Sequence, residues 1–420
     1  MRNFAIVADS EHLALIEQGV TTWNHWYKNN PKVVPDFSGA NLSQLNLQGI
    51  DLRGANLTQV NFSNTDLSEA NLTQANLNRA SLLKANLSKA NLSKANLDYV
   101  IFSQATINRQ TLIDRKSLQI YKIVNNFPLD RNFSQCDLSN SNLFRVNFTG
   151  ADLSNANLSN ANLTNATLSE AYLTGADLSN ANLTNANLTN TYLSHANLTK
   201  AYLGGALCCG TYFKDADLSF VDFKTTKFSE KTIIDLKWYS VWEIVNYGAV
   251  KKNLTRADLS NANLPGVNFK EANLTGAKLQ NAILRGSNFT DTNLVDADLT
   301  GANICAANFT NANLKKAKLK SAIADRHTQL SALKNINNTN QQSSSVPFEE
   351  LTTIQVAAPQ ADMLIPVAHS RSNKNILALL FVAIVAIFVV GAAIFIRNYR
   401  FSEPELEPWE QKVEQMVPAS

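Results

Sequence analysis

The side chains most often used in catalysis are sparse in this sequence and are not grouped. The five histidines are scattered along the chain as His12, His25, His195, His327 and His369. His195 falls at a predicted corner of the repeat described below, and the repeat pattern places no carboxylate beside it. A general base needs a nucleophile or an orienting partner within hydrogen-bond reach. The sequence therefore predicts no catalytic residue, no cofactor-binding residue and no enzymatic activity.

The four cysteines do not form a metal-binding pattern either. Cys136, Cys208, Cys209 and Cys305 make no CxxC pair and have no neighbouring histidine. Cys136 and Cys208 fall at inward positions of the repeat, where a free cysteine acts as a small apolar residue. Cys209 and Cys305 fall at outward positions. The adjacent Cys208 and Cys209 leave a redox role open, but packing is the interpretation that we prefer, and we expect no metal site.

Aromatic residues are the most distinctive candidates for binding a partner. Tyr172, Tyr192 and Tyr212 lie 20 residues apart at the same outward position. They predict either a stacking ladder that stabilises the fold or a docking strip, because tyrosine is enriched in interfaces. Trp238 and Trp242 lie on one side of a predicted helix. That spacing is typical of a side that faces a core, with an aromatic partner groove as the alternative.

A five-residue period must position these side chains. Every fifth residue is apolar within residues 42–112, 133–233 and 254–319. Five matches neither the helical period of about 3.6 nor the strand period of 2, so each unit must combine an extended stretch with a corner. Alanine usually stands two residues before the apolar residue and points inward with it. Corners need unusual backbone dihedrals, and 11 of the 15 glycines fall two residues after an apolar position.

A second period gives the number of sides in each coil. The three tyrosines are spaced by 20 residues, and so are Phe269, Phe289 and Phe309. Like residues in register indicate stacked coils. Four units of five residues make one such step, so each coil is predicted to be a square. The sequence thus predicts a mainly β protein, a parallel β-helix with an alanine and leucine core and a rise of about 4.8 Å per coil.

The repeat resembles a known family. Residues 151–165 read Ala-Asp-Leu-Ser-Asn, Ala-Asn-Leu-Ser-Asn, Ala-Asn-Leu-Thr-Asn, which is similar to the pentapeptide-repeat proteins, and the resemblance covers residues 36 to about 323. It implies a right-handed quadrilateral β-helix, in agreement with the square coil. The segment that precedes the repeats is similar to the leader of cyanobacterial members. Some family members mimic DNA and act on gyrase, but those are small, acidic and soluble, whereas this chain has a net charge of +3.

The N-terminal segment predicts a lid for the first coil. Residues 1–35 are expected to hold one capping helix that ends before Pro31, with Ser10 as its N-cap. Its apolar side recurs at intervals of three and four residues, as Leu13, Ile16, Val20, Trp23 and Tyr27. Open coil edges recruit other chains, so a lid is the preferred interpretation. A helix on a membrane surface is the alternative.

Two similar segments interrupt the five-residue period. TLIDRKSLQIYKIVN and TIIDLKWYSVWEIVN are offset by 121 residues and predict short helices in the breaks 113–132 and 234–252. Asp235 is the candidate cap of the second helix. Each helix either ends one solenoid before the next begins or bulges from a continuous solenoid.

The C-terminal part of the chain predicts a membrane anchor. Residues 376–396 carry no charge and are long enough to span a bilayer. Basic residues flank this run on both sides, so the positive-inside rule does not set its orientation. The start of the chain shows no signal-peptide pattern, so we expect the solenoid on the cytoplasmic side and the short acidic tail across the membrane.

The predicted order of segments follows from these patterns. They are a capping helix (1–35), three pentapeptide solenoids (36–112, 133–233 and 253–323) separated by helical breaks (113–132 and 234–252), a polar linker (324–374), a transmembrane helix (375–397) and a tail (398–420). Near-neutral charge argues against a nucleic-acid partner. We expect a membrane-anchored, non-enzymatic scaffold for protein–protein interaction at the cytoplasmic face. A topoisomerase-interacting DNA mimic and a component of membrane or envelope biogenesis are the alternatives.

Overall fold

The computed structural model describes residues 8–126 and 130–329 of the 420-residue chain. Its helices are α1 (Ser10–Glu17), α2 (Val20–Asn29), α3 (Arg115–Val124) and α4 (Leu236–Tyr247). None of these helices has the length and apolar character needed to cross a bilayer. The predicted linker beyond residue 329, transmembrane helix and tail lie outside the described residues.

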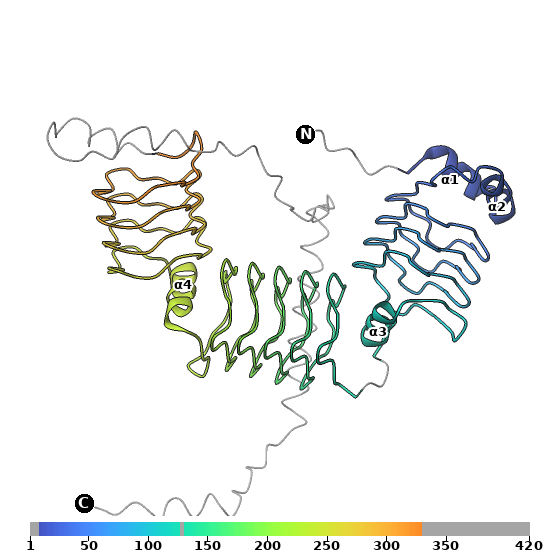
Figure 1. The fold of residues 1–420 in the computed structure, drawn as a ribbon, viewed down its shortest axis with the longest axis horizontal. Helices are drawn as coiled ribbons and strands as arrows, with labels where there is room; N and C mark the ends of the chain where they lie inside the picture. The colour runs from blue at the N-terminus through green and yellow to red at the C-terminus, as the bar shows by residue number, and fades with distance from the viewer. Residues whose placement is uncertain (1–7, 127–129, 330–420) are drawn as a thin grey trace, which may run out of the picture. The chain divides into compact units, whose positions relative to one another are not determined.

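The remaining described chain is coiled into stacks (Figure 1). Parallel β-bridges join residues 20 positions apart, as in Asn56 to Asn76, or Tyr172 to Tyr192. One coil therefore contains four five-residue units, which confirms the square coil that the sequence predicts. Each unit pairs through its outward residue alone, so the sides of the coil are single bridges and not longer strands.

The backbone hydrogen bonds explain why five residues suffice for one side. Leu163 donates its N–H to the carbonyl of Asn182 in the next coil, at 2.8 Å, and Asn165 donates to Thr184 at 3.0 Å. Ala166 closes the corner by donating to Leu163 at 2.9 Å. The corner residue Asn165 has a φ of 58°, in the left-handed region that asparagine tolerates better than most residues. Stacking and corner formation thus use almost every amide of the unit.

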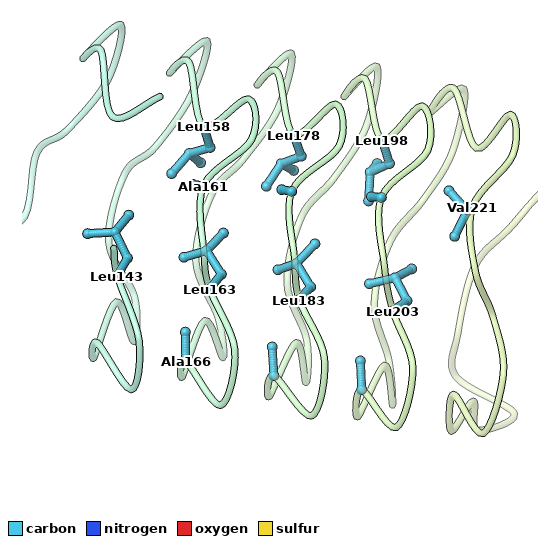
Figure 2. Close-up of a cluster of buried hydrophobic side chains, with 14 of the residues drawn as sticks. Leu143, Leu158, Ala161, Leu163, Ala166, Leu178, Leu183, Leu198, Leu203 and Val221 are labelled. Atoms are coloured by element: carbon cyan, nitrogen blue, oxygen red, sulfur yellow. The ribbon is translucent and has the colours of Figure 1, made fainter. Parts of the chain in front are cut away.

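The core consists of columns of identical side chains. Figure 2 shows Leu143, Leu163, Leu183 and Leu203 side by side in a row, one in each successive coil of the second solenoid, and all four are buried. Alanine fills the space beside each corner. Where threonine replaces that alanine, its hydroxyl donates to a core carbonyl, as Thr191 does to Leu168 at 2.7 Å. A buried hydroxyl therefore keeps a hydrogen-bond partner within the column.

Phenylalanine can form such a column as well. Phe269, Phe289 and Phe309 stack inside the third solenoid with ring centroids 4.9 and 4.7 Å apart and planes inclined by 4°. Their spacing of one coil is what the sequence period predicts.

The bridge ladder stops at both breaks. In the first solenoid the last bridge joins Asn91 to Leu112, and the next ladder begins at Asn132. In the second solenoid the last bridge joins Tyr212 to Ile233, and the third ladder begins at Asn253. A single backbone hydrogen bond still joins the adjoining solenoids at each break, from Tyr99 N–H to Asn140 O at 2.7 Å and from Phe220 N–H to Asn261 O at 2.8 Å. The helices α3 and α4 thus interrupt the bridge ladder without fully separating one solenoid from the next.

The third solenoid extends past its predicted boundary. Its last bridge joins Asn308 to Gln329, whereas the sequence pattern predicts a linker from residue 324 onward. The reason is a turn over Asp325–Thr328 that breaks the five-residue period without ending the coil. Thr328 donates its hydroxyl to Ile304 O at 3.2 Å and so keeps the chain on the stack.

The N-terminal lid consists of two helices, so the prediction of one continuous helix is wrong. Gly19, with a φ of 105°, separates α1 from α2. The N-cap is Asp9 and not Ser10, because the Asp9 carboxylate accepts the N–H groups of Glu11 and His12. These bonds hold the pKa of Asp9 below its usual value, against a smaller opposing effect of burial.

Helix α2 covers the open edge of the first coil. Trp23 donates its indole N–H to Asp51 O at 2.7 Å, and Tyr27 donates its hydroxyl to Arg53 O at 2.6 Å. In later coils the corresponding carbonyls accept backbone N–H groups from the preceding coil. Side chains of α2 thus replace the hydrogen bonds that a missing coil would have supplied.

Candidate functional site

The candidate site is an exposed strip on one side of the second solenoid. We call Tyr172, Tyr192, Tyr212 and Ile233 the tyrosine strip, because successive bridges join each to the next. Tyr172 and Tyr192 stack with ring centroids 5.0 Å apart and planes inclined by 3°. They expose 49% and 44% of their surfaces, Ile233 is also exposed and Tyr212 is half-buried. Four apolar residues therefore follow one another along a single side.

Buried threonines next to two of the tyrosines in the chain hold the tyrosine strip on the core. The inward residue before Tyr192 is Thr191, and the one before Tyr212 is Thr211. Both are buried, and Thr211 donates its hydroxyl to Leu188 O at 2.6 Å. The threonines complete the core, so the tyrosine side chains are free to point outward. Stacking holds the rings of Tyr172 and Tyr192 in one arrangement.

Other outward positions show that the coil does not require tyrosine. The two units immediately before Tyr192 carry Asn182 and Asn187 at the same position, and both take part in regular bridges. Tyr202, on another side, is exposed as well but has no tyrosine before or after it in its column. The run of aromatic residues is thus confined to one side of the solenoid.

The tryptophans of α4 do not lie on this surface. Trp238 and Trp242 expose only 7% and 8% of their area. Trp242 stacks on Phe228 with ring centroids 4.6 Å apart and donates its indole N–H to Thr226 O at 2.9 Å. The Trp242 ring joins the helix to the solenoid and the Trp238 ring is buried as well, so neither adds exposed aromatic surface for the partner groove that the sequence left as an alternative.

The opposite side of α4 continues the apolar surface. Leu236 follows Ile233 closely in the chain and exposes 86% of its area, and Tyr239 is also exposed. At the corresponding positions of α3, 121 residues earlier, stand Arg115 and Leu118. Helix α3 ends the first solenoid without an exposed leucine there. The exposed Leu236 is therefore not a requirement of the helical break.

Charged groups flank the C-terminal end of the strip. The Lys214 ammonium lies 3.1 Å from an Asp215 carboxylate oxygen and 3.6 Å from Asp235. The hydrogen bond to Asp215 is the main reason why the pKa of Lys214 is raised. Asp152, at the other end of the same side, accepts hydrogen bonds from Ser154 that lower its pKa. The strip is thus an apolar band with charged ends.

The histidines and cysteines considered in the sequence do not gather into a metal-binding group within the described residues. Cys208 is fully buried, and that burial strongly raises the pKa of its thiol; Cys136, Cys209 and Cys305 are half-buried. His195 lies at a corner with a φ of 58°. Within residues 8–126 and 130–329, no three histidine, cysteine or acidic side chains are placed to hold a metal ion.

Sequence reasoning missed a pair of asparagines that join the helices to the coils. Asn125, just after α3, accepts the N–H of Gln104 at 2.6 Å and donates to Phe102 O at 3.1 Å. Asn246 of α4 does the same with Thr225 at 2.7 Å and with Phe223 O at 3.0 Å. The signal was present, because both 121-residue-offset segments end in asparagine.

Comparison with known proteins places this architecture in a family. The family of pentapeptide repeats matches in eight copies, at residues 36–74, 70–109, 131–160, 151–190, 161–199, 191–229, 253–291 and 292–324. No curated protein sequence matches the chain.

Solved structures with similarity include other pentapeptide-repeat proteins. HetL, from the cyanobacterium Nostoc sp. strain PCC 7120 and involved in heterocyst differentiation regulation, is 24% identical over 70% of this chain and 91% of its own, with a TM-score of 0.19. A pentapeptide repeat protein of the Arabidopsis thaliana thylakoid lumen is 34% identical over 26% of this chain and 75% of its own, with a TM-score of 0.24. QnrB1, a plasmid-mediated fluoroquinolone resistance protein, is 16% identical over 71% of this chain and 100% of its own, with a TM-score of 0.20.

These TM-scores are too low for an argument from superposition, so the assignment rests on the repeats themselves. The right-handed quadrilateral β-helix of the family agrees with the coils of four units. Eight matched copies spread over residues 36–324 show that the chain belongs to the pentapeptide-repeat family.

Proposed function

We propose that this protein is a non-enzymatic scaffold that binds a protein partner through the tyrosine strip. The observation that carries the proposal is the run of Tyr172, Tyr192, Tyr212 and Ile233 along one side of the second solenoid. Exposed contiguous apolar surface is typical of interaction sites, and tyrosine is enriched in them. The solenoid supplies a rigid frame, because each coil is hydrogen-bonded to both neighbours.

The proposal includes a membrane anchor at residues 376–396 with the solenoid on the cytoplasmic face. Its support is the uncharged apolar run of 21 residues in the sequence. An anchored solenoid would present the strip to proteins at the membrane.

The test uses proximity labelling in vivo from the N-terminus of the full chain. Three variants are compared with the natural chain: Tyr172→Asn with Tyr192→Asn, Tyr202→Asn as a matched control on another side, and a chain that ends at Ser370. Asparagine is chosen because other coils carry it at the same position. We expect the double variant to lose a discrete set of labelled proteins and the Tyr202→Asn control to keep it. Thermal unfolding of each variant checks that the coils remain intact.

Two results would contradict parts of the proposal separately. If the double variant labels the same proteins as the natural chain, the strip is a stabilising ladder and not a docking surface. If the chain ending at Ser370 labels the same proteins as the full chain, the anchor has no part in the choice of partner.

A further inference from the structure

The three solenoids end in the same way. In each one the last bridge spans 21 residues instead of 20, from Asn91 to Leu112, from Tyr212 to Ile233 and from Asn308 to Gln329. One extra residue lies in the final side of each stack.

A threonine hydroxyl fixes this final side in all three solenoids. Thr111 donates to Leu87 O at 2.8 Å and Thr232 donates to Cys208 O at 2.8 Å. Thr328 makes the same contact in the third solenoid. The third end is therefore built as a copy of the first two.

A helix covers each of the first two ends through the same contacts. An aromatic side chain donates to a carbonyl of the last coil: Tyr121 to Ala105 O at 3.1 Å, and Trp242 to Thr226 O at 2.9 Å. Four residues later, an asparagine side chain accepts a corner N–H and donates to a second carbonyl of that coil, as described above for both helices. An aromatic donor followed by asparagine is thus the chemistry that this end binds.

The third end presents the same backbone groups. Ala322 O corresponds to Ala105 O, Leu319 O to Phe102 O, and Ser321 N–H to Gln104 N–H, by their position relative to the threonine. Within the part of the chain that the structure describes, no side chain hydrogen-bonds to any of these three groups at the third end.

The sequence that follows the third end differs from α3 and α4. Counting from Thr328, Asn338 stands where the aromatic donor would be and Gln342 stands where the asparagine would be. The residue before the aromatic position, Ile120 in α3 and Val241 in α4, is Asn337. The 91 residues after Gln329 therefore do not begin with a copy of the covering helix.

Charge also distinguishes the third end. Residues 315–320 read Lys-Lys-Ala-Lys-Leu-Lys, and all four lysines are exposed. Lys318 lies 3.7 Å from Asp298 in the coil before, whereas no ion pair is found for Lys315, Lys316 or Lys320 within the described residues. The edge of this last coil is thus basic and would attract an acidic partner.

We propose that the end of the third solenoid binds a helix from a partner protein. The helix carries an aromatic hydrogen-bond donor, an asparagine four residues later and acidic residues beside them. The backbone groups of the last coil select the aromatic donor and the asparagine, as they do at the two covered ends. The four lysines select the acidic residues. This surface is distinct from the tyrosine strip, so either proposal can fail without the other.

The test uses a fluorescent peptide of residues 233–248 with Lys237→Glu, added to the full chain. The chain's own α3 and α4 cover the first two ends, which leaves the third end for the peptide. We expect saturable binding, weakened at least tenfold when the peptide carries Trp242→Ala with Asn246→Ala. A photoreactive group in place of Val245, which packs against the core where α4 covers its own end, should cross-link to residues 314–324.

Variants of the protein supply the matched control. Lys316→Glu with Lys320→Glu should weaken peptide binding at least tenfold, and raised salt should weaken binding to the natural chain. Lys200→Glu, a corner in the second solenoid, should leave binding unchanged. Glutamate is tolerated at such corners, since Glu170 and Glu271 occupy them with φ near 60°.

Three outcomes would overturn the proposal. The peptide fails to bind, or it binds equally well without Trp242 and Asn246, or its cross-links map to residues 218–226, which would mean that it displaces α4. Sedimentation of the full chain adds a fourth: a dimer that Lys316→Glu with Lys320→Glu dissociates would show that a second copy covers this end.

Discussion

Leu183→Ala tests whether the core columns and the helical breaks have the energetic roles inferred for them. Leu183 is 1% exposed and lies between Leu163 and Leu203 in its column (Figure 2). Removing a buried leucine side chain costs about 2–5 kcal/mol, depending on how far the surroundings can collapse. Hydrogen bonds to coils on both sides hold the backbone in place, so little collapse is expected. The free energy of local unfolding should therefore fall by about 3–4 kcal/mol.

Amide hydrogen exchange followed by mass spectrometry measures this loss along the chain. A fall of about 3 kcal/mol corresponds to a rise of roughly 100-fold in the exchange rate of the affected coils. The bridge ladder is interrupted at α3, so the rise should be confined to residues 133–233 and spare 36–112. Leu87→Ala, equally buried in the first solenoid, should show the opposite distribution. Equal loss of protection in both solenoids, or a change below tenfold, would refute the reasoning.

Three further predictions concern hydrogen bonds. Trp242→Phe leaves the buried Thr226 carbonyl without its indole donor and should lower the free energy of unfolding of the second solenoid by about 1–3 kcal/mol, measured by urea unfolding. Thr191→Val keeps the shape of the side chain but removes the hydroxyl that Leu168 O accepts in addition to the N–H of Ala171, and should cost about 0.5–1.5 kcal/mol, whereas Thr191→Ala should cost less because alanine is the usual residue there. Partial burial raises the pKa of Asp137, but serine hydrogen bonds and a nearby lysine outweigh burial and hold it below its usual value. The stabilisation that this carboxylate gives is therefore present above about pH 4 and should be lost as pH falls through the folded pKa, as thermal unfolding in acid would show.

Each of these results has a contradicting outcome. A Trp242→Phe variant as stable as the natural chain would mean that water replaces the indole. Thr191→Val as stable as the natural residue would show that the hydroxyl contributes nothing net. Asp137→Asn with an unchanged acid profile would exclude this carboxylate as a source of the pH dependence.

The square coil could be predicted because its determinants are local and repeated. Most units place Leu, Ala and a polar residue at fixed positions, and the spacing of Tyr172 and Tyr192 sets the register. The separation of α1 from α2 was not predicted, because the apolar periodicity continues across Gly19 whereas the helical conformation of the backbone ends there. The position where the third solenoid ends was not predicted either, because Thr328 stabilises a turn whose sequence lacks the five-residue period.

The candidate site was harder to predict than the fold. Periodicity placed Tyr172, Tyr192 and Tyr212 on one side but could not distinguish ring stacking from docking. It placed Trp238 and Trp242 on one side of a helix and favoured a core-facing role for that side, but it could not identify the solenoid residues that they would contact. Those distinctions depend on tertiary packing, which no single segment encodes.

The 20-residue register also constrains how such a chain can change its length in evolution. Gain or loss of a whole coil leaves every downstream side chain on its original side, so copy number can drift while the tyrosine strip stays aligned. Gain or loss of a single unit preserves the core pattern but turns everything after it by a quarter. A deletion of five residues between Tyr172 and Tyr192 would thus separate the two rings onto adjacent sides while leaving a buried, hydrogen-bonded coil. Insertion or deletion of four units therefore preserves the alignment of the tyrosine strip, whereas insertion or deletion of one unit disrupts it.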